Sequence, residues 1–120
     1  MSQENAELAH RAFDTFNRRD LGAFLALMDP DVELKARFME VEGDTNFRGA
    51  SGVRDWWEAL LAIFPDLRVE VLEVRDFGDR VIVAARVHGH GLDSGVPIDE
   101  KLWMAGRVRD GRVTWWRELR

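Results

Sequence analysis

The second half of the sequence is a series of segments rich in Val, Ile and Trp, divided by short turn motifs that read FGD, GLDSGVP and RDG. Segments of this composition favour β-strands, and turns this short connect neighbouring antiparallel strands. The expected strands cover residues 67–74, 80–90, 98–109 and 113–119. The sequence therefore predicts an antiparallel meander.

The first half of the sequence has apolar residues at helical spacing instead. One helix is expected over residues 4–18. A second helix follows Asp20, a suitable N-cap, and stops at the Asp29-Pro30-Asp31 cluster. Its apolar side chains are Leu21, Phe24, Leu25 and Met28.

A third helix is expected between a cap at Ser51 and Pro65, and the run VELKA, residues 32–36, is typical of a strand. Helices that precede a sheet bury their apolar stripes against one of its faces. The predicted fold class is therefore α+β, with three N-terminal helices packed on a curved, mostly antiparallel β-sheet.

Composition limits the kind of protein this is. The 120 residues, 46% of them apolar, suffice for one hydrophobic core, so a single domain over residues 1–120 is expected. The net charge of −5, with both signs interspersed, argues against nucleic acid as a partner. Without cysteine, disulfides and closed cysteine zinc sites are excluded. No apolar run approaches the ~20 residues that span a bilayer, so we expect a cytoplasmic protein without a membrane partner.

Strand parity indicates that the sheet is covered on both faces. In the segment 81–85 both alternating sets of residues are apolar. Trp103 and Trp115 have the opposite parity to Met104 and Trp116, so helices on one face cannot cover them all. We therefore expect a homodimer through the outer sheet face. The residues expected at its interface are Ile82, Trp103 and Trp115. The alternative is a monomer with singly exposed tryptophans.

Three blocks of sequence resemble a known family. They are AFDTFNRRDLGAFLALMDPDVEL, FRGASGVRDWWEALLAIFPDLRVEV and DSGVPIDEKLWMAGRVRDGRV. Together they resemble a SnoaL-like, polyketide cyclase-like protein of the nuclear transport factor 2-like superfamily. The resemblance implies a cone-shaped α+β domain, an apolar pocket inside the cone and frequent sheet-to-sheet dimers. It leaves the activity open, because this fold hosts isomerases, cyclases, dehydratases, epoxide hydrolases and non-catalytic domains.

The resemblance also allows a comparison of catalytic positions. Ketosteroid isomerases of this superfamily use a base Asp after the first strand and two cavity acids, one of them Tyr. The chain has no tyrosine, the position of the base falls near Ala36, and that of the second acid falls near Met104. Steroid isomerisation by that mechanism is therefore not expected. SnoaL-like cyclases use a late-strand aspartate, for which Asp99 is the nearest candidate, although its parity places it on the outer face.

Three carboxyl groups are our candidates for proton transfer. Glu100 and Glu118 share the inward face with Met104 and Trp116, respectively, and Glu33 lies on the first strand. A carboxyl group against a tryptophan in an apolar pocket has its neutral form favoured, which suits general acid/base catalysis. The alternative is a solvated or arginine-paired carboxylate. The possible partners of Glu33 are Arg37 and Arg48.

The histidines at 88 and 90 point away from the helices by parity. A bulge at Gly89 could turn His90 inward and make it a proton carrier, and otherwise the pair lies near the dimer surface or the cavity mouth. A His-x-His pair can chelate zinc or copper, with Asp93 as a conceivable third ligand. This ligand set is incomplete, so no metal site is expected.

The aromatic and aliphatic side chains expected to line a ligand pocket come from helices and strands alike. Trp56 follows the apolar stripe of its helix, whereas Trp57 is expected to close the end of the cone. The pocket residues are Phe16, Phe38, Trp56, Leu60, Val83, Val87, Leu102, Met104 and Trp116. The alternative is simple core filling.

Two functions follow from these expectations. The first is proton-transfer chemistry without a cofactor, of the cyclase, isomerase or dehydratase type, on a small hydrophobic, polyketide-like or aromatic substrate. The second is a non-catalytic ligand-binding or dimerisation domain. A third possibility is a structural module whose pocket is filled by its own side chains.

Overall fold

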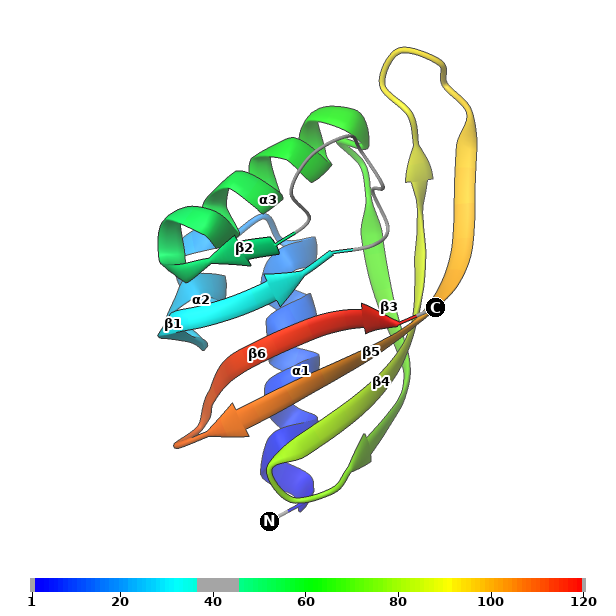
Figure 1. The fold of residues 1–120 in the computed structure, drawn as a ribbon. Coiled ribbons are helices and arrows are strands. Elements are labelled where there is room, and N and C mark those ends of the chain that lie inside the picture. Colours follow the sequence, from blue (N-terminus) through cyan, green and yellow to red (C-terminus); the bar gives the residue numbers. More distant parts are fainter. Residues whose placement is uncertain (1, 37–45, 120) are drawn as a thin grey trace.

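Figure 1 shows a computed structural model of the protein, which describes residues 2–36 and 46–119, with side chains from residue 4 onward. The elements in chain order are α1 (Ser2–Asn17), α2 (Leu21–Ala26), β1 (Met28–Lys35), β2 (Asn46–Arg48), α3 (Gly49–Ile63), β3 (Arg68–Asp76), β4 (Arg80–His90), β5 (Pro97–Arg109) and β6 (Arg112–Leu119). The strands form one sheet in the order β2-β1-β6-β5-β4-β3. No helix in the described part of the chain is long and apolar enough to cross a membrane.

The expected meander is confirmed, since β3, β4, β5 and β6 pair in sequence order and antiparallel. Two features of the sheet were missed. The short strand β2 pairs with β1, and β1 runs parallel to β6 in the middle of the sheet. The fold is thus α+β with a mostly antiparallel sheet, but the third helix follows β1 and β2 instead of continuing an N-terminal helical run.

Helix boundaries differ from the predictions at two points. Asp20 caps α2 as expected, accepting a hydrogen bond of 3.1 Å from the N–H of Ala23. However, α2 ends at Ala26, and Met28 begins β1 because the neighbouring Leu27 C=O accepts a hydrogen bond from the N–H of Val113 on β6. Met28 therefore belongs to the sheet, although helical periodicity had assigned it to α2.

The start of α3 was also predicted wrongly. The helix begins at Gly49, its N-cap is Arg48, and the N-cap makes no side-chain hydrogen bond, so Ser51 is not the cap. Gly49 has a φ of +67°, a left-handed conformation that glycine adopts without steric cost. The glycine turn, and not a capping hydroxyl, sets the start of this helix.

The two large helices lie on different halves of the sheet. Figure 1 shows α1 behind the strands, and it packs mainly on β3, whereas α3 packs on β1 and β2. The helix-facing residues of β4, including Val81 and Val83, are buried as expected. On the opposite face of β4, Ala84 is only 1% exposed and Ile82 is half-buried. The central strands β5 and β6 thus lie in the gap between the two helices.

The C-terminal end of α1 is fastened to the edge strand β3. The side-chain amide of Asn17 donates to the C=O of Val69 at 2.8 Å and accepts from its N–H at 2.9 Å. Arg19 donates to the C=O groups of Pro65 and Leu67 at 2.9 and 2.6 Å. These contacts fix the C-terminal end of α1 to one edge of the sheet.

Candidate functional site

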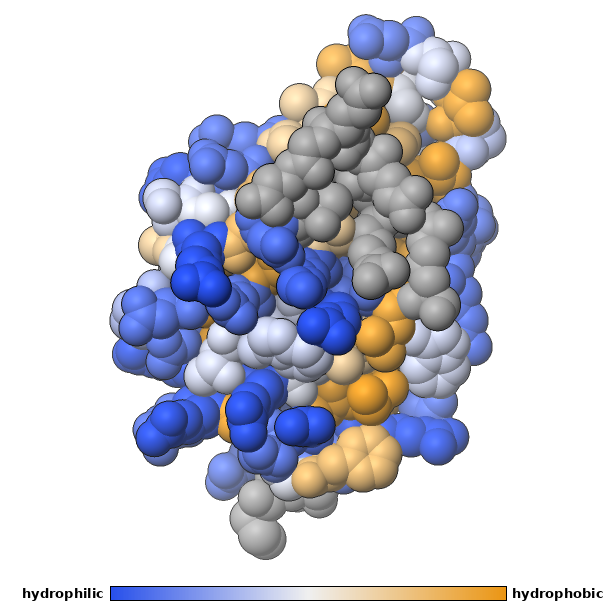
Figure 2. Space-filling model, viewed as in Figure 1, coloured by the Kyte–Doolittle hydropathy of each residue, from blue (hydrophilic) through white to orange (hydrophobic). Residues whose placement is uncertain are grey.

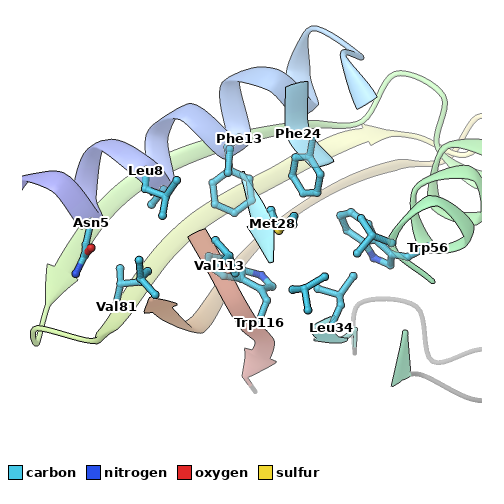
Figure 3. A pocket seen from close by; sticks show the side chains of 15 residues that line it. Asn5, Leu8, Phe13, Phe24, Met28, Leu34, Trp56, Val81, Val113 and Trp116 are labelled. Carbon is cyan, nitrogen blue, oxygen red and sulfur yellow. The ribbon is translucent and has the colours of Figure 1, made fainter. Parts of the chain in front are cut away.

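The gap between the helices contains a small apolar cavity of about 30 Å³. Figure 3 shows its walls, which α1, α2, α3 and the strands all contribute. Asn5 is the one polar residue among the described lining residues, and its amide Nδ2 donates to Asp76 and to the C=O of Gly78. The lining residues are Asn5, Leu8, Ala9, Ala12, Phe13, Phe24, Met28, Val32, Leu34, Val53, Trp56, Val81, Val108, Val113 and Trp116.

Aromatic rings define the shape of this cavity. Phe13 meets Trp116 edge-on with ring centroids 5.6 Å apart, and Phe24 stacks on Trp56 at 6.0 Å. The indole of Trp116 lies against Gly106, where a Cβ would be only 2.7 Å from a ring carbon. Glycine at 106 therefore allows the ring of Trp116 to lie flat on β5. The interlocked aromatic rings enclose an apolar space that suits an apolar ligand.

Glu118 is the buried acid of the concave sheet face. It is 8% exposed and is the only buried ionisable side chain among residues 4–36 and 46–119. It pairs with Met104 across β5 and β6, and lies two positions after Trp116 on the same face. Lys35 pairs with Arg117, so Ala36 and Glu118 come next along β1 and β6. The inward orientation expected for Glu118 agrees with its burial.

The other predicted acids lie elsewhere. Glu100 has the same parity as the buried Leu102, but it is exposed. Glu33 lies on the outer face of β1, and Arg48 donates a hydrogen bond to it. Glu33 therefore lies on the opposite face of the sheet from Glu118, whereas Glu100 shares the face of Glu118 but not its burial. Arg37, the other proposed partner of Glu33, is outside the described residues.

Asp99 lies on the outer face as its parity predicted. Its two oxygens accept hydrogen bonds from Nε and Nη2 of Arg86 at 2.7 and 2.6 Å. These bonds are the main reason that the pKa of the Asp99 carboxyl is held below its ordinary value. A carboxylate neutralised in this way on an exposed face is a structural ion pair and a poor candidate for a base inside the cavity.

His90 points away from the cavity. Pairing between β4 and β5 is regular through Gly89, so no bulge turns His90 inward. Its backbone N–H donates to Asp66 Oδ1 at 2.7 Å, and its Nδ1 lies 2.8 Å from Asp66 Oδ2. These hydrogen bonds lower the pKa of Asp66. A Cβ at Gly89 would lie 2.9 Å from Asp66 Oδ1, so this glycine gives the carboxylate room to reach His90.

The histidines do not form part of a larger cluster of ligands. Within the part of the chain that the structure describes, no group of three or more His, Asp or Glu side chains is placed to hold a metal ion. His88 pairs across the sheet with Asp99, which is already bound by Arg86.

Of the nine predicted pocket residues, two line the cavity, namely Trp56 and Trp116. Phe38 is outside the described residues. Six others lie in the surrounding core without lining the cavity: Phe16, Leu60, Val83, Val87, Leu102 and Met104. The cavity walls that sequence reasoning missed include Phe13 and Phe24. Helical periodicity had already placed both side chains on buried stripes.

Of the two adjacent tryptophans on α3, Trp56 lines the cavity as predicted. Trp57 is 6% exposed and meets Phe16 and Phe24 edge-on at 4.9 and 5.1 Å, so it is the core residue. Trp56 is half-buried at the cavity wall. The apolar stripe of α3 is wide enough that both rings contact the interior, and the closing of the cone by Trp57 stays a prediction.

A curved sheet with helices on one face and an apolar cavity between them defines the class of nuclear transport factor 2-like, ketosteroid isomerase-like folds. The family of SnoaL-like domains matches residues 9–116, so the chain belongs to that family. No curated protein matches the sequence.

Solved structures show the same fold at low sequence identity. TerC, crystallised with polyporic acid, is 22% identical, with a TM-score of 0.84 over 97% of this chain and 90% of that one. IdmH of Streptomyces antibioticus, for which polyketide cyclase activity has been suggested, is 23% identical, with a TM-score of 0.80 over 95% and 89%. A nuclear transport factor 2-like protein of unknown function from Burkholderia pseudomallei is 20% identical, with a TM-score of 0.85 over 97% and 89%.

Proposed function

We propose that the protein binds a small hydrophobic, aromatic or polyketide-like molecule in the cavity between α1 and α3, and that Glu118 transfers a proton to or from it. The observation that carries this proposal is the burial of Glu118 on the inward sheet face, two residues beyond Trp116, which lines the apolar cavity; Glu118 itself is not among the lining residues. The reaction is of the cyclase, isomerase or dehydratase type and uses no cofactor.

The position of Glu118 supports an acid/base role. Superfamily members of the isomerase type use acids at positions that correspond here to Ala36 and Met104, both of which lack a titratable group. Glu118 lies on β6, the strand between β1 and β5, next to Met104. The carboxyl group is thus on the same concave surface, displaced by one strand. A base at this place could act on a ligand carbon held in the cavity.

The chemistry requires a carboxyl group that is shielded from water and close to an apolar ligand. Glu118 as carboxylate would remove a proton from a carbon next to a carbonyl group, and the resulting acid would return the proton to another atom of the same ligand. The rings of Trp116 and Phe13 would hold a flat ligand by stacking. General acid/base catalysis by one positioned group contributes about 10²–10⁴-fold in rate.

The test is a base-catalysed elimination of 5-nitrobenzisoxazole, a flat apolar probe that gives a coloured phenolate when a base removes its C–H proton. We expect the wild type to accelerate this reaction and Glu118→Gln to lose about 10²-fold or more. The matched control is Glu100→Gln, which should keep the wild-type rate. Glu100 is an exposed carboxyl group on the adjacent strand, and it points to the same face of the sheet as Glu118.

An unchanged rate in Glu118→Gln would remove the catalytic proposal. The alternative is a non-catalytic domain of the same fold that holds an apolar ligand. Titration of tryptophan fluorescence with polyporic acid, the molecule crystallised with TerC, distinguishes the two outcomes. Binding without elimination activity supports the alternative, because Trp56 and Trp116 line the cavity in either case.

We further propose that a second copy of the chain covers the outer sheet face. Trp103 is 39% exposed there, and the Lys101 Nζ lies 5.0 Å from the centroid of its ring. The Arg117 guanidinium lies 4.9 Å from the centroid of Trp115. Figure 2 shows hydrophobic atoms on this face bordered by strongly hydrophilic side chains. Ile82 and Trp103 would form an apolar centre, and Trp115, which pairs with Glu33 and Arg107, would belong to a polar rim; this arrangement suits a homodimer.

Sedimentation equilibrium tests the dimer. We expect the wild type to sediment as a dimer and Trp103→Arg as a monomer, since a charge in the centre of the interface would be buried without a partner. Phe77→Arg is the matched control, because Phe77 is 65% exposed and lies in the β3–β4 turn, outside the strands that carry Ile82, Trp103 and Trp115. A monomeric wild type would contradict the proposal.

A further inference from the structure

The cavity is too small for the ligand that the proposed function requires. Its volume is about 30 Å³, whereas ligand pockets typically measure about 300–1,000 Å³. A flat aromatic molecule can enter only if part of the wall moves. The point of entry is therefore the part of the wall that lies close to the surface and is least constrained.

Three wall residues also line depressions on the molecular surface. Leu34 borders a depression at the β1–β2 edge, Val108 borders one beside the β5–β6 hairpin, and Met28 borders one beside α2. Each of these side chains separates the cavity from the outside. They differ in how firmly the structure holds them.

Leu34 and Val108 are held on several sides. Leu34 is 7% exposed and pairs with Phe47 on one side and Trp116 on the other, in the interior of the sheet. Val108 is half-buried and follows an irregularity in the pairing of β5 with β6, but it is β-branched, which restricts its χ1 rotamers. It pairs with Val113, and its N–H donates to the C=O of Asp79 at 2.8 Å. Displacing either side chain would disturb strand pairing.

Met28 is less constrained. It is half-buried, it is the first residue of β1, and the pairing of β1 with β6 is irregular between Met28 and Glu33. An unbranched thioether side chain adapts to different rotamers more easily than Leu or Val. Figure 3 shows Met28 between Phe24 and the strands of the cavity wall. Outside it lies a depression of about 270 Å³.

We infer that ligands reach the cavity by displacing Met28, which makes Met28 the residue that controls access and ligand size. This inference rests on the proposed function, because it concerns entry to the same cavity. The route runs between α2, the start of β1 and the start of α3. The depression at its outer end is lined by Leu25, Ala26, Met28, Asp29, Pro30, Ala50 and Arg112.

The test measures the kinetics of binding of N-phenyl-1-naphthylamine, a neutral apolar fluorophore, by stopped flow. Energy transfer from Trp56 and Trp116 at the cavity wall reports its arrival. We expect Met28→Ala to raise the association and dissociation rates several-fold. Met28→Leu, which keeps the volume but adds a branch, should lower both rates while the dissociation constant stays within about two-fold, because a barrier and not an affinity has changed.

Two controls separate this route from general loosening. Leu25→Ala alters the outer depression without touching the cavity wall and should leave both rates unchanged. Val108→Ala opens the competing route and should change them less than Met28→Ala. Circular dichroism melts establish that each variant is folded, and Met28→Leu keeps the test decisive if Met28→Ala unfolds.

The results that overturn the inference are distinct from those that overturn the proposed function. If the wild type binds the fluorophore but neither Met28 variant changes the rates, or if Val108→Ala reproduces the acceleration, the route is wrong and the cavity remains a ligand site. If neither the wild type nor Met28→Ala binds the fluorophore at equilibrium, both proposals fail.

Discussion

The attachment of α1 to the edge of the sheet allows a quantitative prediction. Strand β3 is an edge strand, so one side of it has no neighbouring strand to bind its backbone groups. At Val69 the side chain of Asn17 takes that place, with hydrogen bonds of 2.8 and 2.9 Å to the C=O and N–H groups. Val69 is only 8% exposed, so water has limited access to these groups. Asn17→Ala therefore leaves two backbone groups without partners.

The expected cost follows from the two hydrogen bonds. Each contributes a net of about 0.5–1.5 kcal/mol to the free energy of unfolding, and an unpaired buried group costs somewhat more than the loss of an average bond. We expect Asn17→Ala to lower the free energy of unfolding by about 2 kcal/mol. For a domain of this size, with a shift of about 4 °C per kcal/mol, the melting temperature should fall by about 8 °C.

Urea unfolding measures this loss, and hydrogen exchange at the Val69 amide identifies its source. In Asn17→Ala the amide of Val69 should exchange faster than its neighbours in β3. Asn17→Asp keeps an acceptor for the N–H but places a carboxylate oxygen against the C=O, so the amide should stay protected while stability still falls. A loss below about 0.5 kcal/mol in Asn17→Ala would refute the reasoning, since it is smaller than one typical hydrogen bond.

Two further predictions concern the cavity and the ion pair at the end of β4. Gly106→Ala places a Cβ 2.7 Å from the Trp116 ring. The substitution should lower the free energy of unfolding by about 1–3 kcal/mol and shift the tryptophan emission to longer wavelength. An unchanged emission spectrum would show that Gly106 does not hold the ring in this position. The His90 hydrogen bonds lower the pKa of Asp66 from its ordinary value of 3.8, so their stabilisation is complete above that value and is lost as the pH falls through the lowered pKa. Asp66→Asn should therefore be less stable than wild type in urea unfolding at neutral pH but approach it in acid, and a constant difference would contradict this linkage.

Much of the fold could be predicted because local patterns determine it. The period of 3.6 in α1 and the cap at Asp20 depend on neighbouring residues, as do the alternating strands β3 to β6. The short strand β2 has no such signal, since three residues are too few for an alternating pattern. The parallel pairing of β1 with β6 joins residues far apart in the sequence, and no local pattern encodes it.

The candidate site was less predictable, because parity gives the face of a side chain and not its depth. Glu100 and Glu118 both have inward parity, yet Glu118 is buried and Glu100 is exposed. Which side chains pack over each position decides this, and strand parity does not show it. The cavity lining by Phe13 and Met28 likewise depends on which helix lies over which strands.

The parallel pairing between β1 and β6 has a consequence for folding. It joins the half of the sheet covered by α3 to the half covered by α1, and Glu118 lies on the strand that makes this connection. Contacts between distant parts of a chain form slowly, because loop-closure entropy must be lost before they are gained. The pairing of Lys35 with Arg117 spans more of the chain than the contact of Asn17 with Val69, so we expect it to form later. Under this order of events, the concave surface around Glu118 is assembled only at the late step that also completes the sheet, and a partly folded chain has no site.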